Sequence, residues 1–158
     1  MPRLIRAWRI VQAHWAERAF DGEGARLYGG RWNPAGLAVV YLADTRALAA
    51  LETLVHAEGS LRKVRYVRYE VTFPKQLVEV AEVDGAAEVA AALSSLIVSP
   101  RTQAVGRDWL ERASQPVLEV RSAIIPEEPN YLLNPRHAKF DQIKIGKAEG
   151  FAFDPRLI

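Results

Sequence analysis

The sequence predicts an α+β fold, a single domain over residues 1–158 with mixed or antiparallel sheets and flanking helices. Three observations favour this class. The expected strands and helices do not alternate regularly, as they would in a doubly wound parallel sheet. Residues 65–73 alternate cleanly between apolar and polar, which is typical of a strand with one buried face. No internal repeat and no linker rich in Gly, Ser or Pro divides the 158 residues.

The individual elements follow from hydrophobic periodicity and from helix and turn signals. The expected strands lie at 4–11, 38–43, 64–73, 77–83, 117–125 and 142–146, with a last extended piece at 150–154. The expected helices lie at 45–58, over 84–96 as one or two helices, and at 101–113, and a long loop covers 21–37. Asp44 or Thr45 can cap the helix at 45–58.

Composition excludes several classes of protein. Apolar residues make up 49% and charged residues 25%, which is ordinary for a globular domain. No apolar run is long enough to span a membrane, and Arg6 and Arg9 interrupt the stretch where a signal peptide would be apolar. The absence of cysteine excludes disulfides and thiolate chemistry and fits a cytoplasmic protein. The net charge of +2 does not by itself indicate a nucleic-acid partner.

The most informative segment is a loop that reads Tyr28-Gly29-Gly30-Arg31-Trp32-Asn33-Pro34. The glycine pair permits positive φ and close approach, and the Asn-Pro step imposes a turn. An arginine on such a loop is placed to grip a phosphate or carboxylate with two bonds. A surface turn with a solvated arginine is an equally simple interpretation.

A second signal is a carboxylate on an apolar helix face. Leu48, Leu51 and Val55 form the expected apolar stripe of the helix at 45–58, and Glu52 falls inside it. Burying an unpaired carboxylate is costly, so Glu52 is expected either to be paired or to line a cleft as a catalytic group. A structural ion pair, with an arginine or with His56, is the alternative.

Three further polar residues lie in apolar segments. Ser122 lies on the more apolar face of its expected strand, where one hydrogen bond would satisfy it, so a structural role is the simpler interpretation. Tyr41 is typical of a core tyrosine with a bonded hydroxyl, although its position could bring it to one cleft with Arg31 and Glu52. Arg9 lies on a strand whose two faces are equally apolar, so the pattern does not say which face is inside.

Several segments together carry a resemblance that covers almost the whole chain: Trp8–Ile10, Gly29–Pro34, Val40–Ala43, Ala49–Glu52, Asn130–Pro135 and Phe153–Leu157. The sequence resembles the RES domain family, which is named for an arginine, a glutamate and a serine. The resemblance implies that Arg31, Glu52 and Ser122 are these three residues. One departure is that Ala138 follows His137, where many relatives carry proline.

The resemblance implies a function as well. It implies the toxin of a bacterial type II toxin–antitoxin pair, with a fold similar to ADP-ribosyltransferases and with NAD+ as the substrate. Members cleave the nicotinamide–ribose bond and pass ADP-ribose to water, to phosphate or, in one branch, to a host metabolic enzyme. The implied partner is an Xre-like helix-turn-helix antitoxin, through which any contact with DNA would be indirect.

Chemistry suggests a role for each candidate residue. Cleavage of the nicotinamide–ribose bond passes through an oxocarbenium-like transition state, which a nearby carboxylate stabilises. Glu52 is expected to supply that carboxylate and to bind a ribose hydroxyl or activate the acceptor. Arg31 and Arg9 are expected to hold the phosphates, Tyr41 to pack on the nicotinamide ribose or ring, and Ser122 to orient the substrate or Glu52.

Other functions remain open alternatives. A nucleic-acid-binding or nuclease-type toxin could use the basic strand 62–69, in which arginines and a lysine are interleaved with Tyr66 and Tyr69. Tyr69, however, falls on the apolar face of that strand. A domain that only binds its partner would leave Glu52 as a structural ion pair. No metal is expected, because the three histidines lack ligand spacing, and no G-x-S-x-G motif surrounds Ser122.

Overall fold

The computed structural model describes residues 1–57, 59, 61–82, 91 and 96–158. Its strands are β1 (Leu4–Gln12), β2 (Val40–Ala43), β3 (Tyr66–Pro74), β4 (Val78–Val80), β5 (Val117–Arg121), β6 (Pro129–Leu133), β7 (Lys144–Ile145) and β8 (Glu149–Phe151). Its α-helices are α1 (Glu23–Tyr28), α2 (Arg46–His56) and α4 (Pro100–Arg112). Short 3-10 turns lie at Ala13–Arg18, Leu61–Lys63, Lys75–Leu77, Phe140–Gln142 and Pro155–Leu157.

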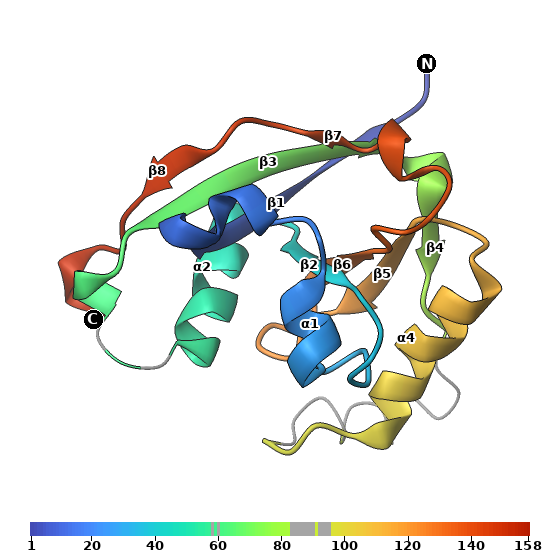
Figure 1. The fold of residues 1–158 in the computed structure, drawn as a ribbon, viewed down its shortest axis with the longest axis horizontal. Coiled ribbons are helices and arrows are strands. Elements are labelled where there is room, and N and C mark those ends of the chain that lie inside the picture. Colours follow the sequence, from blue (N-terminus) through green and yellow to red (C-terminus); the bar gives the residue numbers. More distant parts are fainter. Residues whose placement is uncertain (58, 60, 83–90, 92–95) are drawn as a thin grey trace.

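The described strands form one sheet of eight, in the order β4-β5-β6-β2-β1-β3-β7, with β8 also paired to β3 (Figure 1). β4 and β5 run parallel, and the other described pairs are antiparallel. The predicted α+β fold with a mixed sheet is therefore confirmed.

The sheet consists of two halves that meet at a narrow junction. β1 and β3 pair along their whole length, from Leu4 opposite Pro74 to Gln12 opposite Tyr66. β1 and β2, by contrast, pair only through Trp8 and Ala43. Figure 1 shows the consequence: β1, β3, β7 and β8 diverge from β2, β6, β5 and β4, and the sheet is curled. Helix α2 packs against both β1 and β2 at this junction.

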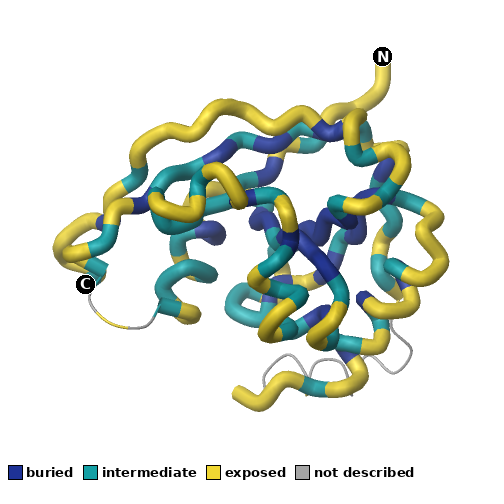
Figure 2. The backbone as a smooth tube through the Cα atoms, viewed as in Figure 1, coloured by how far each residue is buried: buried dark blue, intermediate teal, exposed yellow. Residues whose placement is uncertain are grey.

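Apolar side chains are buried on both faces of the sheet. One face carries the cluster that includes Ala7, Val40, Val71 and Phe73, with Phe140 packed against it. The opposite face packs against α2 and α4 through two further clusters. Figure 2 shows the buried residues following the strands, whereas the β7–β8 stretch is mostly exposed.

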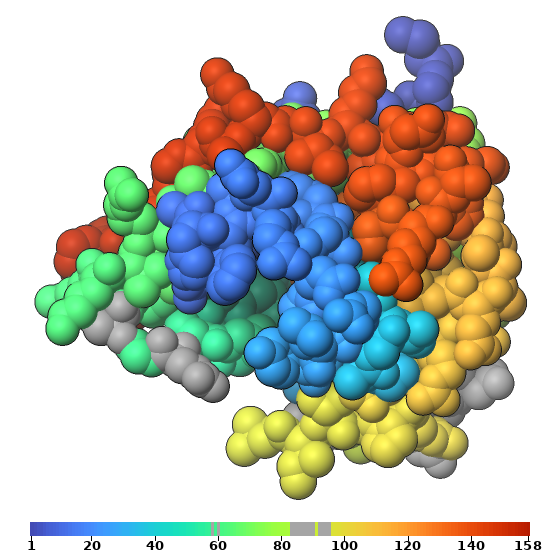
Figure 3. Space-filling model, in the orientation of Figure 1, coloured from blue at the N-terminus to red at the C-terminus, as the bar shows by residue number. Residues whose placement is uncertain are grey.

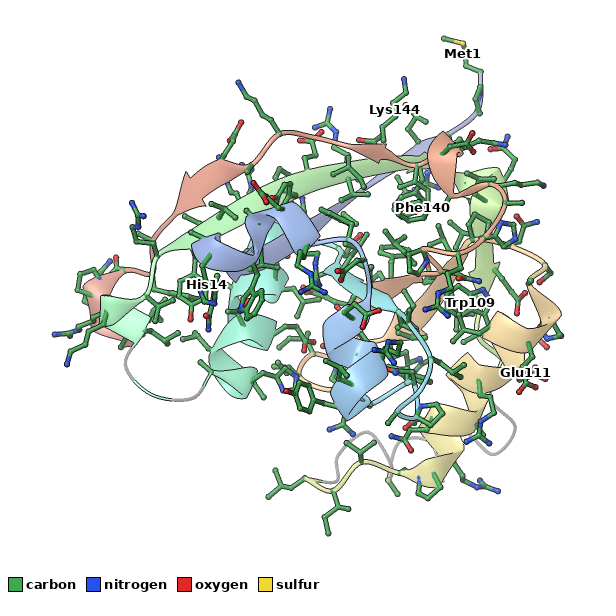
Figure 4. All side chains as sticks on the ribbon, in the orientation of Figure 1. Met1, His14, Trp109, Glu111, Phe140 and Lys144 are labelled. Carbon is green, nitrogen blue, oxygen red and sulfur yellow. The ribbon has the colours of Figure 1, made fainter. Side chains whose placement is uncertain are left out.

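Helix α4 contributes its apolar face to the second of these packed faces. Trp109 is 1% exposed and donates its indole N–H to the Gln115 carbonyl at 2.9 Å. Figure 4 shows Trp109 between α4 and the sheet and Glu111 pointing away from the protein. The position of Trp109 is that of a core residue. No helix in the described part of the chain combines the length and apolarity needed to cross a membrane.

Among the described α-helices and strands, one helix and one strand were not predicted from the sequence. Residues 21–37 contain α1, where Asp21 accepts from the Glu23 backbone N–H at 2.9 Å and Gly29 ends the helix at φ +73°. β6 was also missed, because Pro129 and Asn130 are poor strand formers. β6 nevertheless pairs with β2 and β5 on its two sides. The helices expected over 84–96 lie almost wholly outside the described residues. Of the strand expected at 77–83, only residues 78–80 form β4: residue 77 belongs to a 3-10 turn, residues 81 and 82 are in no strand, and residue 83 is outside the described residues.

Helix α2 differs from the prediction in its N-terminal cap and in part of its apolar stripe. Thr45, not Asp44, caps its N-terminus by accepting from the Leu48 backbone N–H at 3.0 Å. Leu48 is buried, but Leu51 is 38% exposed, so the predicted stripe does not continue into the core. The inward face continues from Leu48 to Glu52, one helical turn later, where the neighbours are polar.

Candidate active site

The loop that carries Arg31 is folded tightly on itself. α1 ends at Gly29, and the Gly30 backbone N–H donates to the Asn33 carbonyl oxygen at 2.9 Å. Trp32 and Asn33 are buried, with exposed fractions of 3% and 0%. The loop is therefore a tight turn in which Trp32 and Asn33 are buried and Arg31 is partly exposed.

Asn33 and Tyr41 hold the loop from within. The Asn33 amide donates to the carbonyl oxygen of Ala25 at 3.0 Å, and its Oδ1 accepts from the Tyr41 hydroxyl at 2.6 Å. The same hydroxyl accepts from the Trp32 backbone N–H at 3.1 Å. A Cβ atom at Gly30 would lie 2.6 Å from the Tyr41 hydroxyl oxygen, so only glycine fits there. Tyr41 is thus a structural support for the loop.

Helix α4 holds the loop from outside. Thr102 donates its hydroxyl to the Arg31 carbonyl at 2.5 Å, and Gln103 donates to the carbonyls of Gly30 and Asn33 at 3.1 and 3.2 Å. Figure 3 shows the start of α4 (yellow) against the surface formed by α1 and the loop (blue to cyan). The backbone of Arg31 is therefore fixed by an element about 70 residues later in the chain.

The electrostatics of this region link Arg31 to Tyr41. Burial raises the pKa of the Tyr41 phenol, while the N–H of Trp32 and the positive charge of Arg31 act in the opposite direction. The phenol therefore stays protonated at neutral pH and can donate to Asn33.

Glu52 lies in a second polar group, on the inward face of α2. Its Oε1 accepts from the Asn130 amide at 2.8 Å and from the Ser122 hydroxyl at 3.0 Å. Its Oε2 lies 4.0 Å from Nε2 of His56, whose side chain is 77% exposed. The Glu52 side chain remains 25% exposed, so the carboxylate is held by the protein and still accessible.

The hydrogen bonds of Ser122 fix the direction of its proton. Ser122 is fully buried in the turn directly after β5, not within a strand as the sequence predicted. Its oxygen accepts the backbone N–H groups of Ile124 and Ile125, each at 3.1 Å. Both lone pairs are then used, so the hydroxyl proton points to Glu52. Ser122 is an oriented donor to the carboxylate.

Strand register places the two groups on one face of the sheet. Tyr41 lies opposite Leu132, and Ala43 lies opposite Asn130, on paired strands β2 and β6. Residues two apart on a strand point to the same face, as do directly opposed residues. Tyr41, with the Arg31 loop above it, and Asn130, with Glu52, therefore share one face between α2 and α4.

Comparison with known proteins identifies the family. The RES domain matches residues 6–154. The chain belongs to the RES domain family. The "Prs ADP-ribosylating toxin" of Sphingobium sp. (strain YBL2) is 37% identical over 154 residues, which are 96% of this chain and 95% of that protein. A "Toxin Res" of Yersinia enterocolitica is 35% identical over 151 residues, 95% of this chain and 97% of that protein. These relatives place the chain among the RES toxins.

A solved structure shows the same fold. A chain in the crystal structure of the M. tuberculosis MbcT–MbcA toxin–antitoxin complex superposes with a TM-score of 0.76. The match covers 96% of this chain and 86% of that chain at 20% sequence identity. The likeness therefore extends over nearly the whole RES domain.

The candidate site contains one residue that the sequence did not single out as functional. Asn130 is 9% exposed and donates to Glu52, yet the sequence analysis used it only as part of a family segment. The sequence did contain a signal for Asn130, namely a polar amide directly before the apolar run Tyr131-Leu132-Leu133. Such a residue in a buried strand needs a hydrogen-bond partner.

Arg9 lies on the opposite face of the sheet from the candidate site. Trp8 faces α2, whereas Arg9 donates to the Ala19 carbonyl at 2.7 Å and to the Tyr41 carbonyl at 2.9 Å. Desolvation lowers the pKa of Arg9 to about 10, against the raising effect of Asp21, so the guanidinium is charged at neutral pH. These contacts make Arg9 a support of the β2 backbone behind Tyr41.

The basic strand 62–69 does not form the surface that a nucleic-acid-binding role requires. Tyr66 and Tyr69 are each 7% exposed and cannot stack on bases. Arg68 pairs with Glu149 at 2.9 Å, and Arg62 donates to carbonyl oxygens near the C-terminus. Among the described residues, no three His, Cys, Asp or Glu side chains are gathered to hold a metal ion.

Proposed function

We propose that this RES-domain chain is the toxin of a toxin–antitoxin pair and cleaves the nicotinamide–ribose bond of NAD+. One observation carries the proposal: an accessible carboxylate, Glu52, is held by two donors on the sheet face that also supports the Arg31 loop. NAD+ requires both an anion-binding group and a carboxylate, because it carries a pyrophosphate beside a ribose that becomes cationic during cleavage.

The proposed mechanism assigns one task to each residue. Arg31, fixed through its backbone, binds the phosphates of NAD+. Tyr41 holds the Arg31 loop and packs beside the nicotinamide ribose. Glu52 stabilises the oxocarbenium ion as nicotinamide leaves, and Ser122 keeps the carboxylate in place. ADP-ribose then passes to water, phosphate or a protein side chain. Arg9, which the sequence suggested as a phosphate ligand, acts through the backbone of β2 instead.

The relatives support this chemistry and the partner. The name of the Sphingobium relative states that it ADP-ribosylates Prs, which supports NAD+ as the substrate here and a protein as an acceptor. The neighbouring solved structure is a toxin–antitoxin complex, which supports an antitoxin as the partner of this chain. We propose an Xre-type helix-turn-helix antitoxin, a cytoplasmic location, and contact with DNA only through that antitoxin.

The experiment follows free nicotinamide from NAD+ incubated with the purified protein, with and without phosphate. Release by the wild type and its loss in Glu52→Gln is the expected result, because the amide keeps the shape and removes the charge. Glu111→Gln, a change of the same kind on the outer face of α4, should release nicotinamide like the wild type. The product mass distinguishes hydrolysis from phosphorolysis.

A transferase that requires its acceptor needs a second arm. Labelled NAD+ is then added to a cell lysate with wild-type protein or Glu52→Gln, and labelled protein is detected after denaturing electrophoresis. Label transfer that depends on Glu52 supports the proposal. If the wild type neither releases nicotinamide nor transfers label to a protein, the proposal is overturned.

A further inference from the structure

The carboxylate of Glu52 has two unequal oxygens. Oε1 accepts both of the short hydrogen bonds, from Ser122 and from Asn130. For Oε2 the part of the chain that the structure describes offers the exposed His56, whose Nε2 lies 4.0 Å away. Of the two donors, the Asn130 amide makes the shorter bond, 2.8 Å against 3.0 Å. The carboxylate is thus held by two bonds to one of its oxygens, and the side chain as a whole remains 25% exposed.

Asn130 makes this bond at the expense of its own oxygen. Its Oδ1 is buried and has no hydrogen-bond partner among the described residues. An unpaired buried carbonyl destabilises a protein, so native structures contain few of them. The opposite orientation of the amide would bring Oδ1 against the carboxylate oxygen and leave the N–H groups unpaired, so the Glu52 bond also decides which way the amide points.

The position of Asn130 on the sheet is rigid. It lies near the start of β6, a central strand that pairs with Ala43 of β2 on one side and with Val120 of β5 on the other. Its amide therefore offers Glu52 a fixed donor, whereas α2 alone would leave the long glutamate side chain several rotamers.

We propose that Asn130 is a positioning residue for the reaction: it holds Oε1 of Glu52 so that Oε2 is the oxygen presented to the ribose of NAD+. This inference rests on the proposed function. It also explains why the Oδ1 of Asn130 is left without a partner among the described residues: the residue is needed there for its N–H donor. Ser122 orients the same oxygen from the other side.

Two variants test the inference. In Asn130→Ala the donor is lost, so kcat for nicotinamide release should fall by about tenfold or more, while KM for NAD+ changes by less than about threefold. Asn130→Asp keeps the shape but places a second carboxylate beside Glu52, so the two must share a proton. When protonated, the introduced carboxyl group can donate to Glu52 as the amide does.

The ratio of kcat for Asn130→Asp to kcat for the wild type should therefore rise as the pH falls from about 8 to about 5. A purely structural role would give a ratio that does not depend on pH. The other titratable and charged groups near the pair, His56 on α2, Asp44 directly after β2, and Tyr41 with Arg31 across the sheet face, are present in both proteins.

Asn134→Ala is the matched control. Asn134 is also buried and follows β6, but its Oδ1 accepts from the Arg136 backbone N–H, far from Glu52 along the strand. The substitution Asn134→Ala should lower the unfolding temperature of the protein and leave kcat per folded molecule within about twofold of the wild type.

The outcomes separate the two proposals. If the wild type neither releases nicotinamide nor labels a protein, the proposed function fails and the role of Asn130 fails with it. If the wild type turns over and folded Asn130→Ala matches its kcat, only the role of Asn130 is overturned. If the ratio for Asn130→Asp is flat with pH, the loss is structural and the positioning role is overturned as well.

Discussion

Gly106 of α4 lies directly against the backbone carbonyl oxygen of Trp32, in the loop that carries Arg31, and leaves no room for a Cβ atom between them. The contact explains how α4 comes close enough for Thr102 and Gln103 to bind the carbonyls of the same loop. A helix interior normally disfavours glycine, so its presence here is explained by packing.

The substitution Gly106→Ala should therefore separate α4 from the loop. We expect the free energy of unfolding to fall by about 1–3 kcal/mol, because the added methyl group overlaps backbone atoms that cannot move freely. Gly24→Ala in α1 is the control: nothing lies within 4 Å of a Cβ there, and alanine favours helix. Urea unfolding measures both. Equal stability of the two variants would contradict the tight contact.

Alkaline pH should destabilise the protein through Tyr41. Burial raises the folded-state pKa of Tyr41 above the ordinary value of 10.0, so above that pH the unfolded chain loses a proton that the folded protein keeps. Stability then falls as the pH rises through the unfolded value. Tyr41→Phe should be less stable near neutral pH, through two lost hydrogen bonds, but should lose less further stability between about pH 9 and pH 11.

The control for this pH dependence is Tyr28→Phe, because Tyr28 is 86% exposed. Its unfolding free energy should follow that of the wild type at every pH. Burial also raises the pKa of Tyr131, with Glu119 and Asp44 adding to the shift, so some alkaline sensitivity should remain in Tyr41→Phe. Parallel curves for wild type and Tyr41→Phe would refute the assignment.

Ser122→Ala should reduce turnover without removing it. The variant loses one of the two donors to Oε1 of Glu52, so kcat should drop by roughly tenfold, less than for Glu52→Gln. It also loses the acceptor for two backbone N–H groups, so the unfolding temperature should fall as well. Ser114→Ala is the control. The exposed Ser114 hydroxyl donates to Glu79, and its loss should leave kcat unchanged.

Arg31→Lys tests the phosphate role. Lysine keeps the charge but cannot make the paired bonds of a guanidinium, so KM for NAD+ should rise by about tenfold while the fold is retained. Arg26→Lys in α1, where the arginine pairs with Glu23 on the surface of the helix, is the matched control with an unchanged KM. Wild-type KM in Arg31→Lys would argue against phosphate binding by this side chain.

Much of the fold could be predicted from local pattern. β3 is the clearest case: Tyr69, Val71 and Phe73 are buried on one face, as the alternation predicts, whereas Val67 on that face is only partly buried and Tyr66 is buried on the other face. β6 could not be recognised, because its stability comes from pairing on both sides and not from its own residues. α1 was hidden by a loop-like composition and is stabilised by its capping contacts with Asp21 and Gly29.

For the candidate site, the sequence predicted the direction of Glu52 but not the residues that contact it. That Glu52 faces inward followed from helical spacing, and the structure confirms it, although Leu51 and Val55 are exposed. Its partners could not be predicted, since Ser122 and Asn130 reach it from 70 and 78 residues away. Periodicity describes which face is inside, not what lies opposite. For the same reason Arg9 could not be assigned to a face.

These separations along the chain have a consequence during synthesis of the protein. A ribosome completes Arg31, Tyr41 and Glu52 early, but the donors that orient Glu52 and the helix that clamps the Arg31 loop are made only after residue 100. A nascent chain, or a fragment cut before β6, therefore carries the Glu52 carboxylate, the proposed catalytic group, without the bonds that hold it. We expect such a chain to be harmless to the cell that makes it until nearly all of it has been translated and folded.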